Sequence, residues 1–499
     1  MVVGRRAVVL GGSVAGLCAA GAVAPHFDEV IVLERDTLPI DAQHRRGVPQ
    51  SKHPHFMLNS GRRAIEGLFP GYEAALIEAG GRLLMPSLDA AYCEATGWAP
   101  RKAGSMTMVY GSRILIERVL RDKVRALGNV TIREGVSVSG ITTEKGGTEQ
   151  GRVTGVLVLG DDQAISADLV VDALGRGSSV SDWLVAAGWP EVPVRSLDAK
   201  VAYTSRWYQL PPADERPDSW WWQHLAIMPN QDRKGTYPPE YDYLTNFFPI
   251  EGDRAIACMG AWGHELPKQS EDFVAAAQRI RTPLFAHAMS QCEPLSEVHF
   301  TRSTGNKWRR YDLMANPPLG LVAIGDSICA FNPFYGQGMS SAARSAVILA
   351  QQLRWASELD QNFARAFLGE QRQSLNVPWM LAMARDQAYD IATGTEVAPR
   401  WRRRLGARFG WPVFTLITCA AREDDYIDVH FGKVFNLDES LSRFITNPRV
   451  IAGLLRHKTK LLLGRNKLPK SFDIRLDPPA TDYSDGPPGI ARPGERIVA

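Results

Sequence analysis

Two glycine-rich segments, about three hundred residues apart, contain the residues best suited to bind a charged organic cofactor. The first is Gly11-Gly12-Ser13-Val14-Ala15-Gly16. The second is Gly325-Asp326-Ser327, followed by Asn332-Pro333-Phe334-Tyr335-Gly336-Gln337-Gly338-Met339. Glycines let a backbone approach phosphate closely, and the free N–H groups at the start of a helix attract anions. Together the segments predict a flavin held at both ends, with its adenosine half on the first segment and its ring on the second.

The first segment has the flanking elements that a dinucleotide site requires. Residues 7–10 are an apolar run typical of a buried parallel strand, and the small residues 15–24 suit a helix packed on a sheet. Residues 29–33 predict a second strand, which Glu34 closes, and an acid at this point accepts hydrogen bonds from ribose hydroxyls. Ser13 replaces the usual middle glycine, but it is small, and its hydroxyl could donate to a diphosphate.

The second segment supplies groups suited to the ribityl chain and the ring. Asp326 ends an apolar run, where an acid is rare without a partner, so a ribityl hydroxyl or a role as a helix cap would explain it. Gly336–Met339 lead into a predicted helix, whose N-terminus would stabilise negative charge on a reduced flavin. No side chain is assigned an acid–base role, and the residues expected beside the flavin ring are Pro333, Gly336, Gln337 and Gly338.

Arg113 is a further candidate ligand. It opens a predicted helix, where a positive charge opposes the helix dipole. A diphosphate or ribityl partner would explain this placement, and a solvated surface arginine is the alternative.

Composition excludes several classes of protein. The chain has 499 residues and a net charge of +3, so it lacks the overall excess of positive charge that is typical of nucleic-acid-binding proteins. The six cysteines and ten histidines show no metal-ligand spacing, and no metal site is expected. Arg5-Arg6 and the alanine-rich run after them imitate a signal peptide, but cleavage would destroy the predicted nucleotide unit. Without an apolar run of about 18 residues elsewhere, we expect a cytoplasmic, soluble protein.

The order of predicted elements indicates an α/β fold, with a Rossmann-like FAD-binding domain, an inserted antiparallel β-sheet domain and a helical C-terminal region. Residues 153–159 and 165–171 flank Gly160-Asp161-Asp162 and predict a hairpin. The expected divisions are 1–184, the first part of the FAD-binding domain; 185–300, the substrate domain; 301–358, the second part of the FAD-binding domain; 359–465, the helical region; and 466–499, an extended or disordered tail.

These motifs, in this order, resemble the flavin monooxygenases of the p-hydroxybenzoate hydroxylase fold. The segment from His44 to His55 also resembles a subgroup of actinobacterial enzymes that includes epoxidases of polyether antibiotic precursors, although hydroxylases share it. The resemblance implies FAD and O2, with NAD(P)H as direct or indirect electron donor. The FAD-binding residues predicted from the motifs and the resemblance together are Gly11, Ser13, Gly16, Glu34, Arg35, Arg46, Gln50, Arg113, Val136, Asp326, Pro333, Gly336, Gly338 and Met339.

The resemblance further implies a reaction. A flavin C4a-hydroperoxide would transfer one oxygen atom to a large apolar, polyene or polyketide-like molecule of secondary metabolism, and we expect alkene epoxidation. The aromatic residues of 185–300 agree with an apolar substrate, or simply pack a sheet. Aromatic hydroxylation, halogenation and prenyl-chain reduction are the alternatives. Trp220-Trp221-Trp222 has the tryptophan spacing of flavin halogenases, but not the Ile-Pro that follows it there.

Leu174-Gly175 departs from the resemblance at a position that bears on reduction. Single-component hydroxylases of this fold typically have Asp-Gly there, linked to both the flavin and the nicotinamide. Leucine forms no side-chain hydrogen bond, and no second glycine-rich unit follows for a nicotinamide cofactor. We therefore expect reduction by a separate flavin reductase or by weakly docked NAD(P)H.

Two basic runs, Arg402-Arg403-Arg404 and residues 456–470, lie in the predicted helical region. They could contact an acidic carrier protein or a membrane surface. A solvated basic helix face is the other interpretation.

Overall fold

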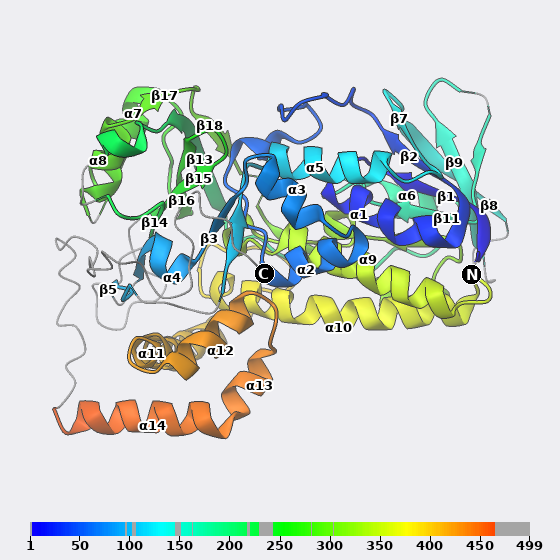
Figure 1. The fold of residues 1–499 in the computed structure, drawn as a ribbon. Coiled ribbons are helices and arrows are strands. Elements are labelled where there is room, and N and C mark those ends of the chain that lie inside the picture. Colours follow the sequence, from blue (N-terminus) through cyan, green and yellow to red (C-terminus); the bar gives the residue numbers. More distant parts are fainter. Residues whose placement is uncertain are drawn as a thin grey trace.

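The structure is a computed structural model, which describes residues 2–94, 97–101, 106–144, 151–161, 163–216, 220–228, 243–280, 282–302 and 304–464. A parallel sheet covered by helices lies beside a second, largely antiparallel sheet, and a group of helices follows at the C-terminal end (Figure 1). This arrangement confirms the expected α/β fold class with its inserted sheet and helical region.

The parallel sheet forms because its inner strands carry apolar runs that are buried on both faces. Alternate side chains point to opposite faces. Ala7 and Val9 therefore pack on one side with helices that include α1, α5 and α9, and Val8 and Leu10 pack on the other side. The strand order is β20 (Leu321–Ala323), β11 (Leu169–Asp172), β1 (Gly4–Leu10), β2 (Phe27–Glu34) and β7 (Val130–Glu134).

Helices from distant parts of the chain cover the first face. α5 starts where the sequence predicts, because the Ser112 side chain caps it by accepting a hydrogen bond from Leu115 N at 3.1 Å. The helices of this layer are α1 (Val14–Val23), α2 (Asn59–Leu68), α3 (Tyr72–Glu78), α5 (Arg113–Arg125) and α9 (Gly338–Trp355).

The second face carries smaller elements. The strand predicted at residues 165–171 is in fact two strands, and at Asp168 the chain passes from one partner strand to another. The Asp168 backbone N–H donates to the Arg6 carbonyl, and the Asp168 side chain accepts from the Arg6 N–H. Only the first of the two strands forms the hairpin, and Asp162 of the predicted turn lies outside the described residues. The elements here are β8 (Val138–Glu144), β9 (Arg152–Val158), β10 (Ile165–Ser166), α6 (Val180–Ala186), β12 (Val194–Leu197), β19 (Asn306–Arg309) and β21 (Cys329–Ala330).

The second sheet is not confined to residues 185–300. Its β4 comes from the first part of the chain and pairs in parallel with β14, with Ala90 opposite His224, because Ala91 and Cys93 of this strand are buried in the core of the second sheet. α7 (Ser270–Ala277) and α8 (Leu284–Ser290) cover one face. The strands are β17 (Glu293–Pro294), β13 (Val201–Gln209), β16 (Arg254–Trp262), β15 (Leu244–Ile250), β14 (His224–Ile227), β4 (Ala90–Glu94) and β5 (Gly97–Trp98), with β18 (His299–Thr301) beside β13.

Shorter elements connect the two sheets. β3 and β6 form a two-stranded sheet, with Arg82 opposite Tyr110. The bounds are β3 (Arg82–Leu84), β6 (Met108–Tyr110) and the short α4 (Pro86–Asp89).

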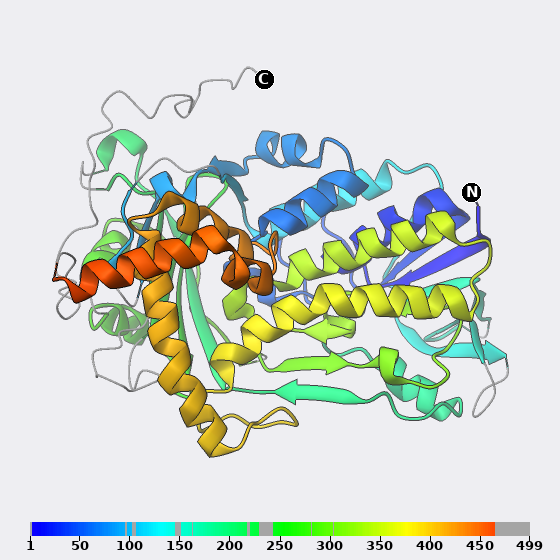
Figure 2. The same ribbon diagram turned by 90° about the horizontal axis from the view of Figure 1, so that it is seen from below.

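The C-terminal helices begin with α10, which crosses the whole parallel-sheet domain, and then gather beneath the second sheet (Figures 1 and 2). Among the described residues, no helix is long and apolar enough to cross a membrane. The expected tail at 466–499 lies outside the described residues. The helices are α10 (Gln361–Asp386), α11 (Arg400–Ala421), α12 (Asp425–Phe435), α13 (Leu441–Thr446) and α14 (Pro448–Leu462).

Candidate functional site

The first glycine segment forms the tight connection between β1 and α1. Gly11 has a φ of 100°, which favours glycine, and a Cβ atom on Gly16 would lie 1.8 Å from the Gly11 carbonyl oxygen. Ser13 occupies the N-cap position of α1, but its hydroxyl forms no cap hydrogen bond. The start of α1 therefore presents backbone N–H groups and a positive dipole end without a side-chain anion in the cap.

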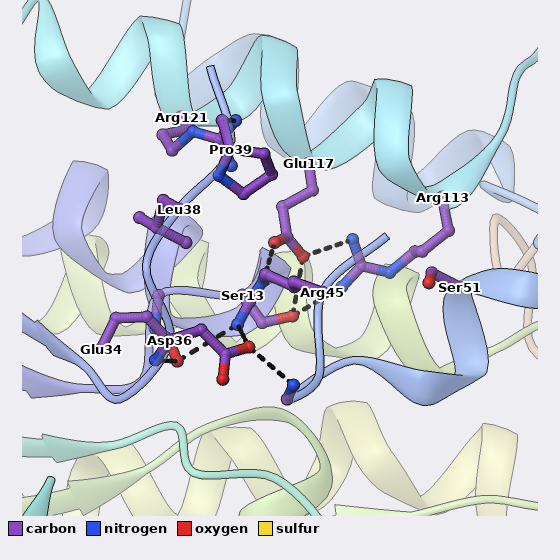
Figure 3. A network of polar contacts seen from close by, with 12 residues as sticks. Ser13, Glu34, Asp36, Leu38, Pro39, Arg45, Ser51, Arg113, Glu117 and Arg121 are labelled. Carbon is purple, nitrogen blue, oxygen red and sulfur yellow. Dashed lines mark hydrogen bonds and ion pairs between the residues drawn. The ribbon is translucent and has the colours of Figure 1, made fainter. Parts of the chain in front are cut away.

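A buried network of charges surrounds this segment (Figure 3). Arg45 lies 3.1 Å from Glu34, 2.8 Å from Asp36 and 2.7 Å from Glu117, atom to atom across each ion pair. Arg113 lies 3.0 Å from Glu117 and donates to the Ser13 hydroxyl at 2.7 Å. These side chains are buried, so each charge depends on its partners for solvation.

The network fixes the ionisation of its acids. Burial by itself raises the pKa of Glu117, but the guanidinium groups of Arg113 and Arg45 outweigh it and hold that pKa below its ordinary value. The pKa of Asp36 is also lowered: shielding from water opposes the shift, and hydrogen bonds from Arg45 and the Gly47 backbone prevail. Both groups are therefore carboxylates at neutral pH.

Glu34 closes β2 as the sequence predicts, and it is buried. One of its oxygens accepts from the Gly12 backbone N–H at 2.8 Å, and the other accepts from Asp36 N at 3.0 Å. Glu34 therefore stabilises the glycine turn between β1 and α1, and it also lies at the candidate site. Its role as a ribose acceptor stays a prediction.

The second glycine segment packs directly on the first. Gly325 has a φ of 71°, and a Cβ atom there would lie 2.7 Å from the Ala15 Cβ of α1. The Asp326 side chain is 38% exposed, yet shielding of its carboxyl group from water raises its pKa, and Arg176 and Arg113 partly oppose that rise. Arg113 therefore acts electrostatically on Asp326 while it contacts Ser13, so the two predicted halves of the site converge.

A buried carboxylate, Asp386, anchors the loop that leads into α9. It is fully buried at the end of α10, and burial raises its pKa although hydrogen bonds to the carboxylate oppose the rise. Its neighbours come from three parts of the chain. They are Trp262 Nε1 at 3.1 Å, Asn306 Nδ2 at 2.8 Å, Asn332 Nδ2 at 3.1 Å and the Tyr335 hydroxyl at 3.2 Å.

These contacts hold the loop in a defined shape. Asn306 Oδ1 also accepts from the Asn332 backbone N–H at 2.7 Å. The chain then passes Pro333, turns at Gly336 with a φ of 62°, and enters α9. The first turn of α9 thus faces the site with its N–H groups.

The other side of the site is formed by aromatic and histidine side chains next to this loop. Phe56 touches Tyr110, Phe248 and His224 ring to ring, and a Cβ atom on Gly336 would lie 3.1 Å from Phe56. His224 lies 3.3 Å from the Tyr110 hydroxyl, and burial lowers its pKa to about 4. It is therefore a neutral histidine at pH 7.

Two buried polar atoms at the candidate site fit the presence of FAD, because the described part of the chain gives them no hydrogen-bond partner. The buried nitrogen Nη2 of Arg45 and the buried oxygen Oε1 of Gln337 have no hydrogen-bond partner among the described residues. Buried polar groups rarely stay unpaired. The Arg45 nitrogen lies in the network around the first segment and the Gln337 oxygen at the start of α9, so the phosphate–ribose half and the ring of FAD would meet them. A Cβ atom on Gly11, Gly12 or Gly16 would collide with the protein's own backbone or with Glu34, so these glycines permit the tight turn itself.

Some of the predicted FAD-binding residues lie at the candidate site, and others do not. Arg35, Arg46 and Gln50 are exposed, and no ion pair or side-chain hydrogen bond of Arg46 occurs within the described residues. Val136 packs at the edge of the second core, and its backbone N–H donates to Glu34 O at 2.9 Å. The residues that lie at the site are Gly11, Ser13, Gly16, Glu34, Arg113, Asp326, Pro333, Gly336, Gly338 and Met339.

Several site residues, among them Glu117, Arg45 and Asp386, were not predicted from the sequence. Glu117 had a usable signal, because it lies four residues after Arg113 on the same helix face. Arg45 is adjacent to the predicted Arg46, and only the loop conformation decides which of the two is buried. Asp386 lies far along the chain in a helical region, and no local motif marks it.

Comparisons with known proteins show what the whole chain is similar to. No protein-family model matches the chain. It is 29% identical over 473 residues to Protein Rv3254 of Mycobacterium tuberculosis, covering 92% of this chain and 94% of that protein. It is 26% identical over 269 residues to kynurenine 3-monooxygenase of Stenotrophomonas maltophilia, covering 51% and 54%.

Solved structures define the fold. PqsL of Pseudomonas aeruginosa, described as a probable FAD-dependent monooxygenase, superimposes with a TM-score of 0.58 at 18% identity, covering 81% of this chain and 99% of PqsL. The flavin-dependent brominase Bmp2 gives 0.58 at 13% identity, covering 93% and 100%. The chain has the fold of the FAD-dependent monooxygenases. Its neighbours in sequence and in structure support an enzyme of that class.

Proposed function

We propose that this protein is an FAD-dependent monooxygenase that inserts one atom of O2 into a large apolar molecule, by epoxidation of a carbon–carbon double bond. The observation that carries the proposal is the contact between the two glycine segments: a Cβ atom on Gly325 would lie 2.7 Å from the Ala15 Cβ, and Arg113 donates a hydrogen bond to Ser13 of the first segment. FAD, when bound, supplies the activation of O2. The similarity to kynurenine 3-monooxygenase and to PqsL supports this class of reaction.

Residues of this chain would bind FAD and orient it. The start of α1 and Arg113 would hold the diphosphate, Glu34 the ribose, and Asp326 the ribityl chain. The first turn of α9 would favour negative charge on the ring, because a helix N-terminus carries free N–H groups and the positive end of the helix dipole. Asp386 keeps the Asn332–Gly336 loop fixed beside it.

The apolar substrate is supported by the side chains opposite the loop. Trp207, Phe248 and Ile256 are buried in one cluster with Tyr110, and Phe56 packs against it. Such a wall excludes water and contacts an apolar molecule through its surface. A double bond needs no base to react with an electrophilic oxygen, so shape and dryness would suffice.

A second candidate, aromatic hydroxylation, is favoured by one observation. The structure places buried neutral histidines by this wall, with the pKa of His53 and of His224 lowered to about 4 by burial. A neutral imidazole can accept a hydrogen bond from a phenol, directly or through the Tyr110 hydroxyl, and so orient it. The sequence alone singled out no such group.

One assay separates these candidates. The protein is loaded with FAD, reduced, and incubated under 18O2 with a linear polyene and, separately, with a phenol matched in size. One 18O atom in a polyene epoxide supports the proposal, whereas label in the phenol alone supports hydroxylation. Product that requires bromide or chloride indicates halogenation, and saturation without oxygen consumption indicates a reductase.

The electron donor can be tested in the same system. Leu174 is 37% exposed at the end of β11, where its backbone N–H donates to Asp172. Its side chain offers no hydrogen bond to a nicotinamide, so we propose that a separate flavin reductase supplies the reduced flavin. Turnover with NADH or NADPH should then be slow until a flavin reductase is added. Equal rates without the reductase would contradict this.

A further inference from the structure

An exposed apolar stripe runs along the first half of α11. Trp401, Leu405, Phe409 and Val413 follow one another at intervals of four residues, and they are 63%, 50%, 63% and 53% exposed. Residues four apart on a helix lie on one side, each rotated by about 40° from the last. Large apolar side chains exposed in a contiguous row mark a contact surface rather than ordinary surface variation.

Arginines border this stripe on the same half of the helix. Arg402, Arg404 and Arg408 are exposed, and the Arg402 guanidinium lies 5.2 Å from the centre of the Trp401 ring. No ion pair engages these three arginines within the part of the chain that the structure describes. The stripe is therefore flanked by positive charge without internal compensation.

The opposite side of α11 is attached to the protein. The Arg403 side chain is 11% exposed, lies 2.9 Å from Asp390 and donates to the Tyr389 backbone carbonyl at 3.0 Å. Arg400 also lies 3.3 Å from Asp390. These contacts fix the rotation of the helix, so that its apolar stripe faces away from its attachment. In Figure 2 the start of α11, drawn in gold, extends to the edge of the molecule.

The attachment point is close to the candidate site. The Tyr389 ring stacks on Trp262 with centroids 5.5 Å apart, and the indole N–H of Trp262 donates to the buried Asp386. Asp386 in turn holds the loop beside the predicted ring position. A surface bound by α11 would thus lie near the elements that border the site.

We propose that the first half of α11 docks the protein onto an anionic lipid surface without crossing it. The apolar stripe would enter the region between headgroups and acyl chains, where tryptophan is favoured, and the flanking arginines would meet lipid phosphates. A helix with one apolar side and an arginine-rich border is too charged to enter the bilayer core, so an interfacial position suits it. The inference does not depend on the proposed reaction, because it rests on α11 alone.

Vesicle sedimentation tests the proposal with the full chain loaded with FAD. We use vesicles of phosphatidylcholine alone and vesicles of phosphatidylcholine mixed with phosphatidylglycerol. The protein should sediment with the mixed vesicles, bind phosphatidylcholine at least about tenfold more weakly, and be released by salt at a concentration that screens surface charge. The double variant Trp401→Ser/Phe409→Ser should lose about tenfold or more in affinity.

A matched control comes from the end of α9, where Arg354 and Trp355 are both exposed. The variant Arg354→Gln/Trp355→Ser removes one exposed arginine and one exposed tryptophan outside α11 and should bind mixed vesicles like the wild type. Absence of vesicle binding by the wild type, or an equal loss in the control, would overturn the proposal. So would a wild-type dimer that the α11 variant converts to a monomer without any vesicle binding, since the stripe would then contact a second copy.

Discussion

Replacing Arg45 with methionine should destabilise the apo-protein and weaken FAD binding, whereas the same change at Arg46 should do neither. Arg45 forms three buried ion pairs, at 2.7, 2.8 and 3.1 Å, and Arg46 is exposed. Removing one member of a buried pair costs about 3–5 kcal/mol, because the remaining charge stays buried without compensation. Arg113 still faces Glu117, so we expect the lower end, about 3 kcal/mol. Arg46→Met should change stability by less than about 0.5 kcal/mol.

The pKa shifts of the buried acids also predict how the stability difference between wild type and Arg45→Met changes with pH. The pKa values of Asp36 and Glu117 lie below their ordinary range in the folded protein. The stability from this lowering is present above the unfolded pKa of about 4 and is lost as the pH falls through the folded values. Arg45→Met removes the part of that contribution that Arg45 supplies, while Arg113 still lowers the pKa of Glu117. The difference in the free energy of unfolding between wild type and variant should therefore be largest near neutral pH and should disappear below about pH 4.

The assays are urea unfolding of the apo-proteins at several pH values and FAD titration followed by flavin fluorescence. The unpaired Arg45 Nη2 is buried, so losing one charge-assisted bond to FAD should weaken binding by about 10- to 100-fold. The sequence alone favoured Arg46. If Arg46→Met weakens FAD binding and Arg45→Met does not, the reasoning from the buried network is refuted.

Three further substitutions probe the rest of the site. Gly16→Ala should abolish FAD retention, because the new Cβ would lie 1.8 Å from a backbone carbonyl oxygen, while Gly67→Ala, with nothing within 4 Å, should leave bound flavin unchanged; flavin content after purification measures both. Asp326→Ala should weaken FAD binding by about tenfold or more without changing urea unfolding of the apo-protein, and an unaltered FAD affinity would remove it from the cofactor site. Asp386→Asn should lower the free energy of unfolding by about 2–4 kcal/mol and shift the visible spectrum of bound FAD, because an amide NH2 cannot accept hydrogen bonds from the buried donors. The control is Asp390→Asn, an exposed residue shortly after Asp386. An equal spectral shift in the control would contradict the anchoring role of Asp386.

The sequence by itself determined the local features. The glycine turn, the strand before it and Glu34 after it are fixed by neighbouring residues, since φ > 0 at Gly11 and the buried strand follow from residue type. The helix start at Arg113 was likewise predictable and is capped by Ser112. The second sheet was predictable in kind, but β4 was not assigned to it, because strand pairing across 134 residues, as between Ala90 and His224, leaves no local trace.

The tertiary structure decided which charges meet. Arg45 and Arg46 are chemically identical neighbours, and only the path of the loop after β2 buries the first among three carboxylates. Asp386 reaches the Asn332 loop because α10 crosses the domain and ends there. Electrostatic and hydrogen-bond energies depend on distance and burial, which residue order does not encode locally. The chain alone therefore indicates a flavin site, and the fold selects the residues that build it.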